Sequence, residues 1–209
     1  MLVATSGRGR GEKPLELIPG TDSEVVQWCS PAGDGECTVV WLPTERLDIQ
    51  VASAEVTAGE RRRAAGYTRE SHRLLSLGSA WLTRQIVATL LDVPPLKVPI
   101  VRDCPGCTKP HGRPVIGALT RDGSTVHVSA THSRGLVGVA ISTTGEIGID
   151  VENLQARGPD AWRTVARVLG RAPVSEAPEG ENGPEAAMTA ATAWVRTEAV
   201  LKATGYGLA

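Results

Sequence analysis

Apolar residues recur at intervals of three and four between residues 58 and 91, and this spacing predicts a long helical region that Pro94 and Pro95 end. A shorter helical pattern covers residues 161–169, and a last one follows the Pro-, Gly- and Glu-rich stretch at 172–184. Short β-rich runs bounded by Gly, Pro and Asp predict strands at residues 38–42, 97–102, 113–119, 125–130, 136–142 and 147–152.

The order of these elements predicts an α+β fold in two similar lobes. Residues 1–36 are rich in Gly, Pro, Ser and charge and lack apolar periodicity, so we expect a mobile N-terminal arm there. We place the N-terminal lobe at residues 37–122 and the C-terminal lobe at 123–209, with the second lobe short at its C-terminal end. The stretch at 172–184 is expected to be a mobile loop.

Composition narrows the classes of function. The 209 residues are 41% hydrophobic, enough for one domain or two small lobes. The net charge of −1 and the pI near 6.4 give no reason to expect nucleic-acid binding or a polybasic membrane contact. No run reaches the roughly 20 apolar residues of a membrane span, and the first residues lack a signal-peptide core. We therefore expect a cytoplasmic protein whose four cysteines stay reduced.

The end of the chain carries the first candidate site. Trp194, Glu198 and Lys202 recur every four residues, so they lie along one face of a helix. Asp150 and Glu152 stand at strand spacing and point the same way. Three carboxylates from two segments suggest a hard cation such as Mg²⁺. The alternative is a pair of solvated acids and an ordinary helical Glu–Lys pair worth about 0.2–0.5 kcal/mol.

A second candidate is the sequence T-H-S-R-G at residues 131–135, between two β runs. Two hydroxyls and an imidazole at a tight turn can donate hydrogen bonds to a phosphate. The alternative is a hairpin turn with an exposed histidine.

The third candidate covers residues 102–114, R-D-C-P-G-C-T-K-P-H-G-R-P. Cys104, Cys107 and His111 have spacing that could begin a zinc site, although a fourth ligand is not evident, and a loop of reduced thiols is the alternative. Arg102 and Arg113 are suited to phosphate or to the face of a base. An arginine cluster at residues 61–63 is either a solvated face or a further anion-binding element.

Four blocks in this order, H-G-R-P, S-A-T-H-S, G-I-D-V-E and W-V-R-T-E-A-V-L-K-A-T-G-Y-G-L, resemble the successive signatures of the 4′-phosphopantetheinyl transferases of the surfactin-synthetase-activating type, in their actinobacterial form. The resemblance covers residues from Thr38 to the C-terminus. It implies two pseudo-twofold-related α+β lobes with the active site in the cleft between them. It also implies coenzyme A as donor, Mg²⁺ as cofactor with Mn²⁺ as an alternative, an apo acyl or peptidyl carrier protein as partner, and a monomer.

The resemblance also assigns roles to residues. It implies that Asp150, Glu152 and Glu198 bind the metal, with Asp150 also on the donor side. It further implies that Glu198 is the general base and that Lys202 and His132 act beside it in catalysis. Position 197 is Thr, where the family usually has Lys in W-x-x-K-E-A.

Other residues match the family's donor-binding positions. The resemblance places a group of them on the phosphates and adenine of coenzyme A: Arg61, Arg63, Arg102, Gly112, Arg113, Pro114, Thr131, His132, Ser133 and Lys202. Our hypothesis is a 4′-phosphopantetheinyl transferase serving polyketide or non-ribosomal peptide assembly. The alternatives are a non-catalytic relative that binds coenzyme A or a carrier protein, and a zinc-stabilised binding protein.

Overall fold

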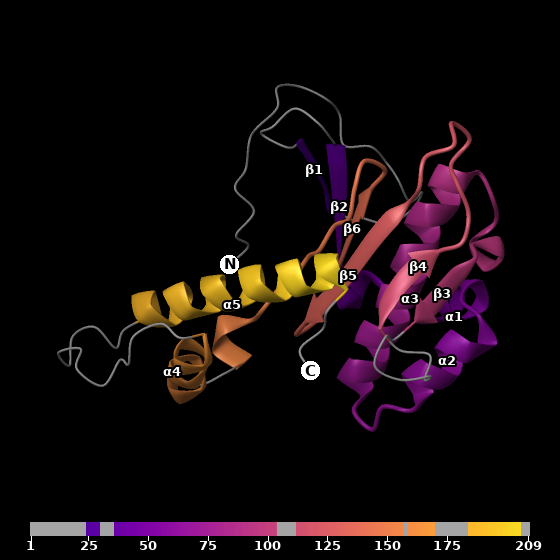
Figure 1. The fold of residues 1–209 in the computed structure, drawn as a ribbon. Helices are drawn as coiled ribbons and strands as arrows, with labels where there is room; N and C mark the ends of the chain where they lie inside the picture. The colour runs from indigo at the N-terminus through magenta and orange to yellow at the C-terminus, as the bar shows by residue number, and fades with distance from the viewer. Residues whose placement is uncertain (1–23, 30–35, 104–111, 157–158, 170–183, 206–209) are drawn as a thin grey trace.

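The structure is a computed structural model that describes residues 24–29, 36–103, 112–156, 159–169 and 184–205. It contains both helices and antiparallel sheets, so the predicted α+β class is confirmed (Figure 1). The strands are β1 (Glu24–Cys29), β2 (Glu36–Pro43), β3 (Ile100–Asp103), β4 (Arg113–Ile116), β5 (His127–Ser133) and β6 (Leu136–Ser142). The helices are α1 (Ile49–Glu55), α2 (Ala58–Ala65), α3 (Glu70–Leu91), α4 (Pro159–Val168) and α5 (Pro184–Thr204). Short 3-10 turns cover Thr44–Arg46, Pro95–Lys97 and Leu154–Ala156.

The main sheet has four antiparallel strands in the order β1-β2-β6-β5, and β3 and β4 form a separate hairpin. β5 and β6 are joined by Arg134 and Gly135, both at positive φ, which is the two-residue turn that matches the twist of paired strands. β1 lies inside the segment that we expected to be an arm. Its sequence E-V-V-Q-W-C is rich in β-forming residues, and the sheet takes it in as an edge strand. Residues 1–23 and 30–35 of that arm lie outside the described residues.

One face of the sheet packs on α3. Val40, Val128 and Val139 from the strands join the buried face of α3 in the largest hydrophobic core. By length and composition α3 is the one helix in the described part of the chain that could cross a membrane. Its apolar side chains form this core instead.

The predicted helix over residues 58–91 is two helices. Thr57 and Glu60 form a capping box that starts α2, and Gly66 ends it. A second start at Arg69 opens α3. The buried Arg84 guanidinium joins the two helices, because its Nε lies 2.7 Å from Glu60 Oε2.

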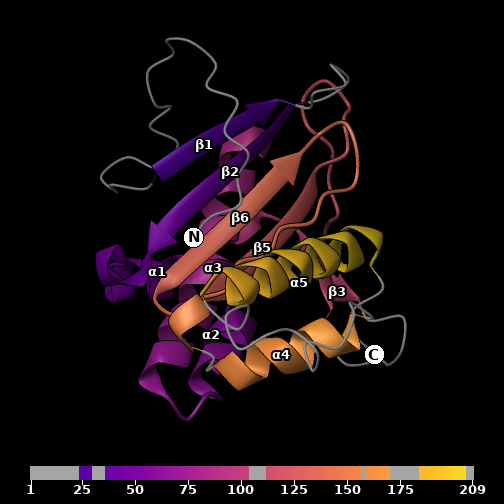
Figure 2. The ribbon, with the colours of Figure 1, turned by 90° about the vertical axis from the view of Figure 1, so that its left-hand side faces the viewer.

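α5 lies on the opposite face of the sheet from α3, as Figure 2 shows, and α4 packs beside it. Trp162 of α4 is 2% exposed and anchors a second core with Val165, Ala190 and Ala191. The Trp41 ring packs directly on Gly138 of the neighbouring strand. A Cβ on Gly138 would lie 2.3 Å from that ring.

The division between the two cores differs from the expected lobe boundary at residues 122 and 123. β6 pairs with β2, β5 pairs with β6, and both share the core of β2 on α3, whereas the second core includes residues only from Leu154 onward. The reason is that the apolar residues of β5 and β6 face α3, which turn signals in the sequence do not reveal. The segment predicted as a strand at 147–152 is extended but has no backbone ladder with β5.

Candidate functional site

The segment before Asp150 runs directly against the C-terminal half of α5. A Cβ built on Gly148 would lie 1.8 Å from the carbonyl oxygen of Ala199, so only glycine permits this approach. Glu198 and Lys202 flank this contact point on α5, one helical turn apart. The close approach therefore brings together the two segments that the sequence analysis singled out.

Asp150 is held by two partners. Lys202 Nζ donates to Asp150 Oδ1 at 2.7 Å and to the carbonyl oxygen of Ile149 at 3.1 Å. The Thr131 hydroxyl donates to the same Asp150 oxygen at 3.0 Å. The Asp150 side chain is 9% exposed and that of Lys202 30%, so this ion pair is partly shielded from water and has a fixed geometry.

Glu198 lies beside this pair with one oxygen unsatisfied. Its Oε1 is buried and has no hydrogen-bond partner among the described residues. Burial raises the pKa of the Glu198 carboxyl, the negative charges of Asp150 and Glu152 raise it further, and Lys202 opposes them. A carboxylate with a raised pKa is a stronger base, which suits proton abstraction.

The three carboxylates have the chemistry of a site for a hard divalent cation. The orphaned Glu198 oxygen and the mutual repulsion with Asp150 and Glu152 are what a cation would relieve. Within the described ranges no group of three or more His, Cys, Asp or Glu side chains is arranged to hold a metal ion. Lys202 supplies the positive charge next to Asp150 in this arrangement. The chemistry of these oxygen donors suits Mg²⁺, although the described side chains are not arranged to hold it.

Thr131, His132 and Ser133 do not form one surface at a turn, because all three belong to β5 and alternate between its faces. Thr131 and Ser133 point to the segment carrying Asp150, whereas His132 is exposed on the other side. Partial desolvation of this exposed side chain lowers the pKa of His132, a backbone hydrogen bond opposes the shift, and the charges of Lys202 and His72 lower the pKa further. The imidazole is therefore neutral at pH 7 and offers a hydrogen bond rather than a charge.

The predicted donor-binding arginines divide into two groups. Arg61 turns inward and donates to the carbonyl oxygens of Ser53 at 2.7 Å and Val56 at 2.6 Å, which ties α2 to the end of α1. Burial lowers the pKa of Arg102, and the positive charge of Arg63 lowers it further, so these two guanidinium groups lie near each other. The negative charge of Glu60 opposes this lowering and partly compensates the two arginines.

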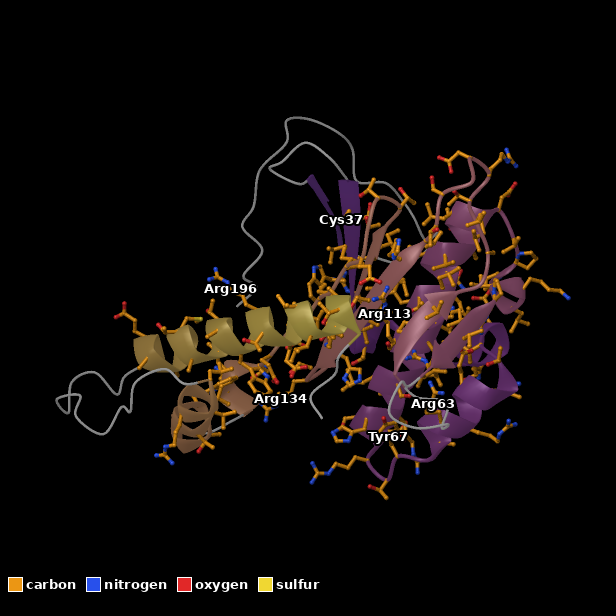
Figure 3. All side chains as sticks on the ribbon, viewed as in Figure 1. Cys37, Arg63, Tyr67, Arg113, Arg134 and Arg196 are labelled. Carbon is orange, nitrogen blue, oxygen red and sulfur yellow. The ribbon has the colours of Figure 1, made fainter. Side chains whose placement is uncertain are left out.

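Arg113 connects the β3–β4 hairpin to α5. Its Nη1 donates to the carbonyl oxygen of Ala203 at 2.7 Å and lies 3.1 Å from Glu146 Oε1. Its buried Nε has no partner among the described residues. Figure 3 shows Arg113 beside the C-terminal end of α5, with Arg63 of α2 and Tyr67, which follows α2, lower in the same view. Arg113 thus satisfies a helix C-terminal carbonyl as well as bearing charge near the site.

The neighbours of Arg113 define the loop end of the hairpin. Gly112 has a φ of 97°, a conformation that favours glycine, and its carbonyl oxygen accepts from Arg102 at 3.1 Å. Pro114 is buried in β4. Cys104, Cys107 and His111, the candidate zinc ligands, lie outside the described residues.

The structure corrects the prediction for one residue near the site and adds two that were not predicted. Trp194, expected to face the site, instead packs on the second core. Ser129 and Gly148 were not among the predicted site residues, although the sequence indicates both. S-A-T-H-S places a hydroxyl at every second position, and G-E-I-G-I-D has a glycine just before the acids. Thr197 donates to the Ala193 carbonyl oxygen at 2.9 Å, so its hydroxyl is used within α5.

Comparison with known proteins does not assign this site. No model of a known protein family matches the chain, and no curated protein sequence matches it.

Proposed function

We propose that this protein is a 4′-phosphopantetheinyl transferase, which moves the phosphopantetheine arm of coenzyme A to a serine of an apo acyl or peptidyl carrier protein. The sequence blocks that resemble this family supply Asp150, Glu152, Glu198 and Lys202. In the proposal the second core around Trp162 is part of a second lobe, and the site lies between it and the β3–β4 side.

The observation that carries the proposal is the environment of Glu198. Its buried oxygen has no hydrogen-bond partner in the part of the chain that the structure describes, its pKa is raised by burial and by two acids, and a lysine lies within the same cluster. An uncompensated carboxylate beside a fixed Asp150–Lys202 pair is costly for the fold, and such costs are typical of functional sites. A general base and a cation for a departing phosphate are the two groups that this transfer requires.

The proposed reaction balances with groups from this chain and its two substrates. The carrier serine oxygen forms a bond to the phosphorus that bears pantetheine, and the bond from that phosphorus to the bridging pyrophosphate oxygen breaks. Glu198 accepts the serine proton, and 3′,5′-ADP leaves with the electron pair. Lys202 orients and compensates the departing phosphate, and the neutral His132 donates a hydrogen bond to phosphate oxygen. Mg²⁺, held by Asp150, Glu152 and Glu198, supplies positive charge against the pyrophosphate when bound.

In the proposal Arg63 and Arg102 bind a remote phosphate of the donor, because burial and the charge of Arg63 disfavour the Arg102 cation and a phosphate would favour it. Arg61 is a weaker candidate, since its guanidinium already contacts two backbone carbonyls. Binding of the donor at these arginines would hold the pyrophosphate near Glu198 and would contribute through positioning.

A second candidate function is a non-catalytic relative that binds coenzyme A or a carrier protein. The observation that favours it is the pairing of Lys202 with Asp150, which leaves the described carboxylates without an arrangement that holds a metal ion.

The test is intact-mass spectrometry of apo carrier proteins incubated with this chain, coenzyme A and Mg²⁺, with a chelator control. The proposal predicts a metal-dependent gain of one phosphopantetheine arm, and its loss in Glu198→Ala. Glu185→Ala is the matched control, because Glu185 is an exposed acid at the other end of the same helix. Coenzyme A binding by calorimetry without any mass gain would favour the non-catalytic relative.

A further inference from the structure

The segment that carries the acids is attached to the sheet by side chains rather than by a backbone ladder. The amide nitrogens of Ile149, Val151 and Asn153 each lie 3.2 Å from a hydroxyl oxygen of β5. Those hydroxyls belong to Ser129, Thr131 and Ser133, in that order. Each pair is separated by 20 residues in the sequence, so the segment runs parallel to β5 in constant register.

Alternation along a strand explains the pattern. The three hydroxyl residues occupy every second position of β5, so they share one face. The other face carries Val128 and Ala130 toward the α3 core. Amides at every second position of an extended segment likewise point one way, which matches three donors to three acceptors.

We infer that Ser129, Thr131 and Ser133 form a hydroxyl ladder that sets the register of residues 149–153, and that Thr131 is a positioning residue for Asp150 rather than a contact to donor phosphate. The Thr131 hydroxyl accepts from Val151 N and donates its one proton to Asp150 Oδ1 at 3.0 Å. Thr131 is also 4% exposed, so its hydroxyl is sequestered from a ligand approaching through solvent.

The ladder determines which acid meets Lys202. A slip of the segment by one residue would turn the acids to the opposite side, and a slip by two would bring Glu152 to the place of Asp150. Ser129 is 4% exposed and anchors the entry to the segment next to Gly148, where α5 leaves no room for displacement. The three hydroxyls therefore fix the position of the Asp150 carboxylate.

Hydrogen exchange of backbone amides in the full chain tests the ladder without requiring any activity. Ser129→Ala is expected to speed exchange mainly at Ile149, and Thr131→Val mainly at Val151, each by about fivefold, because each removes one acceptor. Thr131→Ser keeps the hydroxyl and should restore protection at Val151. Ser142→Ala is the control, because this buried hydroxyl accepts from Thr144 N and lies outside the ladder. Exchange at both segment amides unchanged within twofold in Ser129→Ala and Thr131→Val would overturn the inference.

A kinetic measurement, which rests on the proposed function, tests the role of Thr131. If it positions Asp150, Thr131→Val lowers kcat about tenfold or more, with the KM for coenzyme A nearly unchanged, and Thr131→Ser restores kcat. If it binds donor phosphate, the KM rises while kcat holds, and the positioning role is refuted. If the unaltered protein does not transfer phosphopantetheine, the proposed function is wrong. The hydrogen-exchange experiment still tests the hydroxyl ladder in that case.

Discussion

Replacing Glu198 by glutamine is expected to stabilise the folded protein while removing its activity. The side chain keeps its size and shape but loses the charge that burial, Asp150 and Glu152 all disfavour. The neutral amide also no longer repels the charge of Asp150. A substitution that raises stability and removes function is expected where the side chains of a functional site stand in an unfavourable environment.

The size of the gain follows from the environment. A buried acceptor without a partner costs roughly 1–3 kcal/mol, and glutamine retains one oxygen while Glu198 is only partly buried. We therefore expect a gain in the free energy of unfolding of about 1 kcal/mol at pH 8. For a chain of this size that corresponds to a rise in Tm of about 2–4 °C.

The pH dependence has a definite sign. A carboxyl whose pKa is raised on folding favours the folded state when protonated and disfavours it when charged. The advantage of Glu198→Gln is therefore complete above the folded pKa and shrinks as the pH falls through it. It disappears below the unfolded pKa of about 4.3, where both chains carry a neutral group.

The assay is urea denaturation of both proteins at pH 8 and pH 4. Glu185→Gln is the control, because this exposed acid lies in the first turn of α5, where a negative charge is favourable. The control should be neutral or slightly less stable. Equal or lower stability of Glu198→Gln at pH 8, or a gain that does not change with pH, would refute the reasoning.

Three further substitutions probe the surroundings. Arg84→Met should lower the free energy of unfolding by about 3–5 kcal/mol, because the Glu60 carboxylate loses its ion-pair partner and the carbonyl oxygens of Pro95 and Val98 lose a donor. A loss in urea denaturation no larger than that of Arg84→Lys would contradict this. Gly148→Ala should lower the free energy of unfolding by about 1–3 kcal/mol and abolish the proposed transfer, because its Cβ would meet the Ala199 carbonyl oxygen. Normal transfer in this variant would show that the segment can move away from α5. Lys202→Met should lower the free energy of unfolding, because it leaves the largely buried Asp150 carboxylate without its cation. Unchanged stability in urea denaturation would argue against the ion pair.

The sequence was sufficient to predict the elements of the site but not all of its contacts. Four-residue spacing put Glu198 and Lys202 one turn apart, and Asp150 of G-I-D-V-E contacts Lys202. Helical periodicity and strand alternation are local properties, so they can be read from neighbouring residues. The α+β class follows from the same signals.

Contacts between distant segments were not predictable in this way. Nothing local in the sequence shows that Thr131 would serve Asp150 rather than face solvent with His132. Arg61 stands in a cluster of like charge, yet its guanidinium turns to backbone carbonyls. These hydrogen bonds depend on which buried acceptors still lack a donor when the chain has folded. That is determined by the tertiary structure and not by neighbouring residues in the sequence.

The most direct test of the central claim is to measure both products of one reaction. Apo carrier protein, coenzyme A and Mg²⁺ are incubated with the full chain, and the modified carrier serine and 3′,5′-ADP are quantified together by mass spectrometry. The account predicts that both accumulate in equal amounts and that both disappear in Glu198→Gln. Absence of both products across several carrier proteins, with coenzyme A bound, would contradict it.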